Sequence, residues 1–138
     1  MDARAVAERC AALIVTIEKT TPALTSFCRR VREARSDIDL AVRELASLAT
    51  TLECLTADIT ESSSHHLRPS LMERMSGVLR GCHNVILEIV KTIAIFDGKK
   101  PTALIKWDVT GRGDMEKLFS TLEAQRTALG LGLDMLSL

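Results

Sequence analysis

Two adjacent histidines are the most metal-like feature of the sequence. His65 and His66 lie in a polar, serine-rich stretch, and the nearest acidic residue is Glu61. A protein zinc site needs three or four ligands, mostly cysteine, histidine or carboxylate side chains at short spacings. Because no cysteine accompanies the pair, we interpret it as part of a loop. We therefore predict neither a metal site nor a cofactor.

A cysteine next to a histidine suggests a thiolate–imidazole pair, which can serve as a nucleophile and its base. Cys82 and His83 have this order, but the surrounding spacing is that of a helix. Neighbouring side chains on a helix point about 100° apart, so these two do not face each other. The sequence offers no Ser-His-Asp or paired-carboxylate set either. We predict that the protein is not an enzyme.

Four cysteines occur, at positions 10, 28, 54 and 82, and none of them forms a CxxC pair. Each lies beside apolar residues in a helix-like segment. We interpret them as buried, reduced thiols, which are typical of a cytoplasmic protein. A disulfide framework or a zinc site is the alternative. No uninterrupted apolar run reaches the roughly 18 residues that a membrane-spanning helix needs.

The charges of the chain balance, with 18 Lys and Arg against 18 Asp and Glu. No bulk charge therefore attracts nucleic acid or membranes. The chain has no Tyr and one Trp, so it lacks the aromatic platforms on which bases stack. We predict no nucleic-acid partner, and any electrostatic targeting must come from a local patch.

The densest positive patch is the run RRVREAR, which contains Arg29, Arg30, Arg32 and Arg35. Each basic residue close to an anionic lipid surface contributes about 1 kcal/mol, so the run is a candidate membrane contact. The alternative is a solvated face whose arginines pair with the carboxylates nearby.

Helices must position these residues. Between Asp37 and Ile59 the large apolar residues recur every three or four positions, which places them on one helical stripe. Such a stripe must be covered by partner helices, and the rest of the chain supplies them. Pro22 predicts a kink or a short break, so the segments on either side are one bent helix or two helices in line. The predicted helices are at about residues 3–19, 22–35, 37–59, 69–97 and 114–136.

These elements predict an all-α fold, an antiparallel four- to five-helix bundle. The whole chain, residues 1–138, forms a single domain in this interpretation. It is either a small stand-alone protein or the N-terminal domain of a longer one.

The first helix carries an apolar face made of Cys10, Leu13, Ile14 and Ile17. One interpretation is that this face belongs to the core. The other is that it contacts a membrane, which requires the helix to leave the bundle. Such a change needs an element whose two states differ by only a few kcal/mol.

Two glycines in the segment 69–97 form a small-x-x-x-small step. Gly77 and Gly81 would let another helix backbone approach closely. The step predicts either a tight internal crossing or a seam between copies of the chain. We assign Trp107 a structural role.

The order of elements resembles a known family. The run FCRRVREARSDIDLAVRELASLATTLECL contains an A-R-S-D-I step before a Leu-rich helix. A second run, IKWDVTGRGDMEKLFSTLEAQRTALGLGLDML, places Lys106-Trp107 about ten residues before a series of leucines from Leu118 to Leu133. Nearly the whole chain thus resembles the N-terminal domain of fungal STAND-type (NLR-like) proteins, of the HeLo-like group.

The resemblance implies a helical bundle that executes or relays programmed cell death in fungal non-self recognition, as in heterokaryon incompatibility. It also implies that clustering, driven by an attached or separate NLR-type regulator, lets the N-terminal helices act on membranes. We therefore expect a non-enzymatic signalling or cell-death effector that acts by oligomerisation and by membrane targeting or permeabilisation. The expected partners are further copies of the chain and anionic lipids, with a cytoplasmic location that shifts to the plasma membrane on activation. The alternative is a protein–protein interaction adaptor without membrane activity.

Overall fold

The computed structural model of the chain describes residues 2–61, 67–97 and 107–136. Within these ranges the prediction of an all-α fold is confirmed, since every regular element is helical. A short 3-10 helix, η1 (Arg32–Ala34), precedes α2, and a π-helical turn, η2 (Trp107–Gly111), precedes α5. The long elements are α1 (Ala3–Arg30), α2 (Arg35–Glu61), α3 (Pro69–Phe96) and α5 (Arg112–Leu136).

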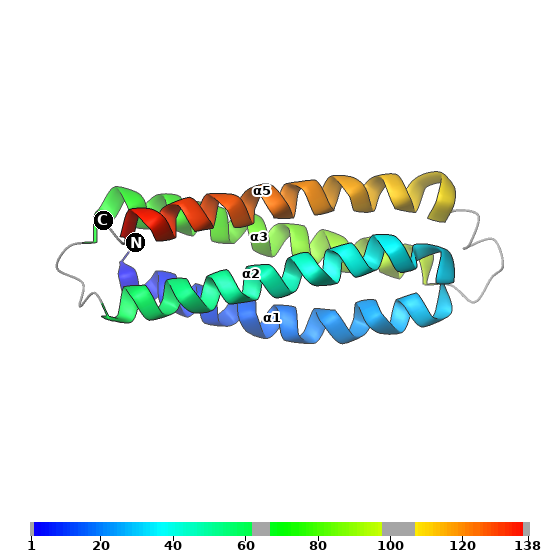
Figure 1. Ribbon diagram of the computed structural model, residues 1–138, viewed down its shortest axis with the longest axis horizontal. Coiled ribbons are helices and arrows are strands. Elements are labelled where there is room, and N and C mark those ends of the chain that lie inside the picture. Colours follow the sequence, from blue (N-terminus) through cyan, green and yellow to red (C-terminus); the bar gives the residue numbers. More distant parts are fainter. Residues whose placement is uncertain (1, 62–66, 98–106, 137–138) are drawn as a thin grey trace.

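The four long helices lie side by side in an elongated molecule (Figure 1). Both α1 and α5 contact α2, and both also contact α3, so each helix has two neighbours. The apolar stripes face inward and form one continuous core. The stripe predicted from Asp37 to Ile59 is its centre, because Ile38, Leu45 and Leu52 of α2 are fully buried there.

Of the two alternatives at Pro22, the structure has the single helix and excludes the break, because α1 runs through the proline without interruption. Pro22 removes the amide that would bond the carbonyl of Glu18, but Glu18 is exposed and water can reach that oxygen. The hydroxyl groups of Thr20 and Thr21 also donate to the carbonyl oxygens four residues earlier, at 2.7 and 3.0 Å. The proline is therefore tolerated inside the helix.

The chain instead turns at Val31, inside the segment 22–35 that was predicted to be one helix. Val31 leaves helical geometry, with φ −122° and ψ 85°, while its amide still donates to the carbonyl oxygen of Phe27 at 2.8 Å. Both Val31 and Ala34 are buried. The turn therefore buries apolar side chains while it reverses the chain from α1 into α2. At the other boundaries the prediction differs from the structure by at most two residues.

A cluster of three aromatic rings closes one end of the molecule. Trp107 is fully buried, and its ring centroid lies 5.4 Å from that of Phe27 and 5.5 Å from that of Phe96. The indole N–H donates to the Asp37 carboxylate at 3.0 Å, and Arg112 Nε donates to the same oxygen at 3.2 Å. The aromatic end cluster (Phe27, Phe96 and Trp107) thus joins α1, α3 and η2, while Asp37 ties it to α2.

One charged side chain among the described residues is buried between two helices. Glu44 of α2 is only 6% exposed, although its spacing places it beside the apolar stripe. It forms an ion pair with Arg126 of α5, whose Nε donates to Glu44 Oε1. The partner that permits this burial lies on another helix, so the spacing of apolar residues within α2 does not indicate it.

The fit of Trp107 against Gly111 generates a test. A Cβ added to Gly111 would lie 2.5 Å from an indole carbon, and the ring is held on its other sides. We expect Gly111→Ala to lower the free energy of unfolding by about 1–3 kcal/mol, as overpacking does. The matched control is Gly113→Ala, which meets open space and should be neutral or stabilising by up to about 1 kcal/mol. Urea unfolding measures both, and equal effects of the two changes would contradict the assigned packing.

Candidate functional site

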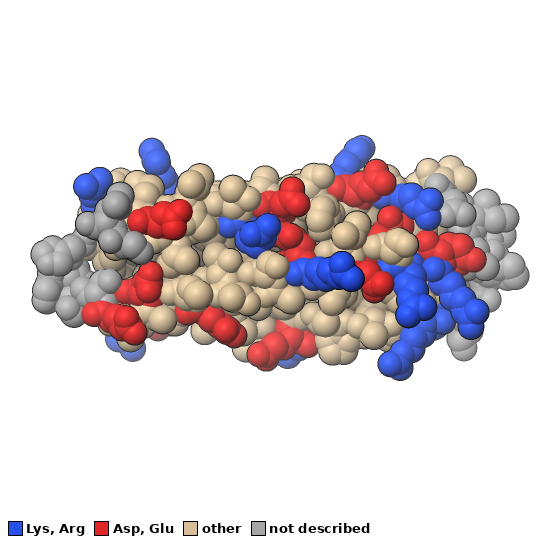
Figure 2. All heavy atoms as spheres, viewed as in Figure 1, with Lys and Arg blue, Asp and Glu red and all other residues tan. Residues whose placement is uncertain are grey.

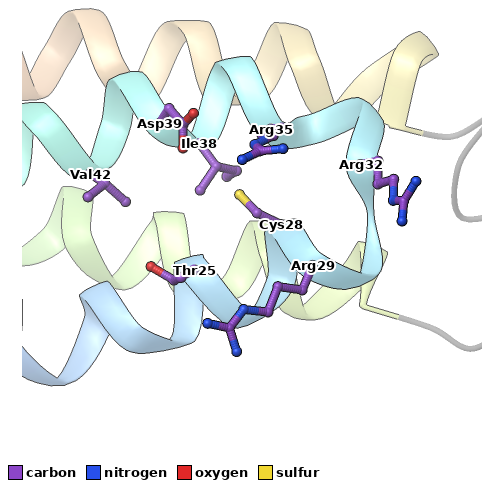
Figure 3. Close-up of a pocket in the computed structure, with 8 residues that line it drawn as sticks. All are labelled: Thr25, Cys28, Arg29, Arg32, Arg35, Ile38, Asp39 and Val42. Carbon is purple, nitrogen blue, oxygen red and sulfur yellow. The ribbon is translucent and has the colours of Figure 1, made fainter.

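The turn between α1 and α2 forms a groove lined by three arginines. It has a volume of about 890 Å³. Figure 3 shows Arg29 on the α1 side, Arg35 on the α2 side and Arg32 at the turn between them. We call it the arginine groove. Its lining residues are Thr25, Cys28, Arg29, Arg32, Arg35, Ile38, Asp39 and Val42.

The arginines of the groove keep their charges available to solvent. Arg29, Arg32 and Arg35 are exposed, and within residues 2–61, 67–97 and 107–136 none of the three forms an ion pair with a carboxylate. Figure 2 shows Lys and Arg side chains gathered at the end of the molecule where α1 ends and α2 begins. The turn at Val31 places the three arginines around one groove, because it folds the two halves of RRVREAR onto different helices.

Arg30, the fourth arginine of the run, has a different environment. Its Nε and Nη2 atoms donate to the two carboxylate oxygens of Asp97, both at 2.7 Å, and its Nη1 donates to Ser26 Oγ at 2.7 Å. Hydrogen bonding to Asp97 raises the pKa of Arg30. This bidentate pair links the end of α1 to the residue that caps α3. Arg30 therefore belongs to a structural contact and does not line the groove.

The apolar face of the first helix lies in the core. Cys10, Leu13 and Ile17 are buried, and Ile14 is half-buried. In this arrangement Cys10, Leu13 and Ile17 are shielded from solvent, and Ile14 is partly accessible. Across the described residues, no helix combines the length and the apolar character needed to cross a bilayer.

The cysteines of the core are not poised for chemistry. Burial raises the pKa of Cys10 to about 11 and that of Cys82 to about 12. Burial also raises the pKa of Cys28, and the charge of Asp39 adds to this effect. All four cysteines are free thiols. Because the neutral thiol is favoured, Cys82 is a poor nucleophile, and His83 beside it is exposed to solvent.

Metal ligands do not gather in the described part of the chain. There, no group of three or more His, Cys, Asp and Glu side chains could hold an ion. His65 and His66 lie outside the described residues, as does Lys106.

The two glycines of α3 have different surroundings. A Cβ on Gly81 would overlap the side-chain amide of Gln125 in α5, whereas a Cβ on Gly77 would meet nothing within 4 Å. Gly132 of α5 is a second close approach, since a Cβ there would lie 2.5 Å from the Met75 methyl carbon of α3. The α3–α5 crossing thus uses Gly81 and Gly132. The spacing of residues in the sequence did not indicate Gly132, because Met75, against which it packs, lies on another helix and far away in the sequence.

The comparisons with known proteins give no assignment: no protein-family model, curated protein or solved structure matches the chain. The chemistry must be inferred from the residues. Guanidinium groups bind phosphate and carboxylate oxygens with paired hydrogen bonds. Three of them around one groove can hold an anionic surface or ligand. Val42, which is half-buried, adds an apolar side chain to the lining of the same groove.

The raised thiol pKa values generate a pH prediction. Unfolding exposes thiols of ordinary pKa, about 8.5, whereas folded Cys10 and Cys82 keep their protons to about pH 11 and 12. Above about pH 8.5 the folded state therefore binds more protons than the unfolded state. The free energy of unfolding should fall by up to about 1.4 kcal/mol per pH unit for each thiol.

Urea titrations between about pH 8 and pH 10 measure this slope. We expect the double change Cys10→Ala with Cys82→Ala to flatten it, and Cys54→Ala, at an exposed position, to leave it unchanged. A slope that persists in the double variant would assign the alkaline loss of stability to other groups.

Proposed function

We propose that the chain is a non-enzymatic signalling domain that binds anionic membrane surfaces through the arginine groove. The observation that carries this proposal is that Arg29, Arg32 and Arg35 line one groove, exposed and without ion pairs to carboxylates among the described residues. At about 1 kcal/mol for each basic residue, three of them contribute roughly 3 kcal/mol, or about a hundredfold in affinity. Because the net charge of the chain is zero, binding should be oriented by this one end.

We also infer that the four long helices form an antiparallel bundle. What supports this arrangement is that α1 packs on α2 and α3 packs on α5 in opposite directions, whereas the other two neighbouring pairs, α1 with α3 and α2 with α5, run in the same direction (Figure 1). The short turn between α1 and α2 supports it as well, because a 3-10 helix of three residues reverses the chain between them.

The resemblance to fungal HeLo-like domains extends the proposal to cell-death signalling. Under it, the domain is cytoplasmic, clusters in response to an attached or separate NLR-type regulator, and moves to the plasma membrane. Membrane targeting needs only the exposed arginines. Permeabilisation by the first helix is a separate step, since Leu13 and Ile17 would first have to leave the core.

A protein-interaction adaptor is the second candidate function. The observation that favours it is a set of large apolar side chains on the surface, among them Leu87, Val90 and Leu131. Under this alternative the domain binds a partner protein and does not act on lipid.

Vesicle binding tests the arginine groove. We expect the triple change Arg29→Glu, Arg32→Glu and Arg35→Glu to abolish co-sedimentation with vesicles that contain phosphatidylserine. The matched control reverses three exposed cations elsewhere, Lys19→Glu, Arg74→Glu and Lys117→Glu, and alters the net charge by the same amount. This control should keep most of the binding, and added salt should weaken the binding of the unchanged protein. Equal losses in both variants, or no binding by the unchanged protein, would contradict the proposal.

A pair of substitutions on α1 tests whether its apolar face is core. Leu13 is buried, so Leu13→Glu would place a carboxylate in the core and should cost several kcal/mol, seen as lost helicity or a lower melting temperature. Val15 is 46% exposed on the same helix, and Val15→Glu should leave the melting temperature nearly unchanged. A Leu13→Glu protein that is as stable as the control, but no longer releases dye from vesicles, would instead indicate a first helix that acts on lipid from outside the core.

A further inference from the structure

A second groove runs between α1 and α3. It has a volume of about 310 Å³, and Leu13 and Leu79, which are almost completely buried, form its apolar floor. Two cations, Arg9 and Arg80, also line it, together with the exposed His83. We call it the α1–α3 furrow. Its full lining is Arg9, Ala12, Leu13, Thr16, Leu79, Arg80 and His83.

Two polar contacts fix the register of α1 against α3. Arg9 Nη1 donates to Ser76 Oγ at 3.1 Å, and Arg30 donates to Asp97. Both contacts join residues that are 67 positions apart. The two helices therefore run in the same direction with a constant offset of 67 residues. This offset places Thr20 of α1 level with Leu87 of α3, and Ala23 level with Val90.

This register extends the furrow as an exposed apolar strip on α3. Leu87 and Val90 follow His83 by four and seven positions, so they lie on the same side of α3. Thr20 and Ala23, the α1 residues at their level, have short side chains that cannot cover them. Leu87 is accordingly 42% exposed and Val90 is 37% exposed.

A second exposed apolar strip lies on α5. Leu131 is 61% exposed and Met135 is 45% exposed, and their spacing of four places them on one face of the helix. The only charged residue from position 127 to position 136 is Asp134, which is also exposed. We call Leu131 and Met135 the α5 strip. The α5 strip and the α1–α3 furrow share no residue and lie on different helices, so one copy can use both surfaces at once.

We propose that the α5 strip of one copy docks into the α1–α3 furrow of a second copy. The occupant suits the furrow in shape and charge, because a helix carrying apolar anchors at i and i+4 fits a groove between two helices. Asp134 beside the strip faces Arg80 at the rim of the furrow. The two surfaces differ, so the contact is head-to-tail and can add further copies. It gives a surface to the self-association in the proposed function, and it requires no lipid.

The interface has few anchors, so it is weak. Stable complexes usually bury more than about 1,000 Å², and here one helix face meets one groove. We expect the complex to form in the micromolar range and to respond steeply to a charge placed at its centre. Leu87→Glu and Leu131→Glu each introduce a carboxylate that would have to lose its water on docking. Either change should therefore raise the dissociation constant at least about tenfold.

Analytical ultracentrifugation of residues 1–138 without lipid tests the proposal. We expect the average mass of the unchanged protein to rise between about 1 μM and about 1 mM. Leu87→Glu, which blocks the furrow, and Leu131→Glu, which blocks the strip, should each remain monomeric. An equimolar mixture of the two should form one-to-one dimers that grow no further, because each variant retains the surface that the other lacks. The control Val15→Glu alters neither surface and should associate like the unchanged protein.

Three results would overturn the proposal: an unchanged protein that stays monomeric, a single variant that still associates, or a mixture that fails to pair. A charge exchange provides a test that leaves the apolar surfaces untouched. Asp134→Arg alone should weaken association, and its mixture with Arg80→Glu should restore pairing; a mixture no tighter than either variant would count against the predicted contact. Because no vesicle is present, these results are independent of the arginine groove.

Discussion

One end of the molecule depends on the hydrogen bonds that the Asp37 carboxylate accepts. A single oxygen accepts the indole N–H of Trp107 and the Nε–H of Arg112, and so holds η2 and the start of α5 against α2. The indole in turn packs on Phe27 of α1 and Phe96 of α3. Without this acceptor, a fully buried indole would lose its hydrogen bond, at a cost of about 1–3 kcal/mol. All four long helices thus meet around one ring. Arg112 also donates to the carbonyl oxygen of Glu33 in η1, so the turn that shapes the arginine groove is tied to the same point.

Polar contacts fix the positions that the apolar core leaves open. A stripe of leucines buries nearly as much surface when a helix slides by one turn, whereas a hydrogen-bonded pair does not tolerate the shift. Arg30 with Asp97 and Arg9 with Ser76 align α1 with α3. Glu44 with Arg126 performs the same role between α2 and α5. We regard these contacts as determinants of register more than of stability: desolvation offsets much of the gain from the Glu44–Arg126 pair, and solvent screens the exposed Arg30–Asp97 pair.

Periodicity predicted the helices because each stripe is a local property of the sequence. The stripe of α2 and the start of α3 at Pro69 follow from spacing and from the missing amide of proline. The turn at Val31 was not predictable in this way, since it depends on where Val31 and Ala34 find a core to enter. Arg30 differs from its three neighbours through its pair with Asp97, which is 67 residues away, and through its hydrogen bond to Ser26. The run of arginines in the sequence therefore indicated the candidate site, but tertiary contacts decide which of these arginines line the groove.

The proposed membrane contact and the proposed self-association use different parts of the molecule. The arginine groove is at the turn between α1 and α2, whereas the α5 strip belongs to the last turns of α5. Figure 1 places these segments at opposite ends. A copy held to a lipid surface by its arginines would keep its strip available to a neighbour. Head-to-tail growth would then gather many arginine grooves on one membrane, and the binding energies of linked copies add. Clustering would therefore strengthen membrane binding without any helix leaving the core.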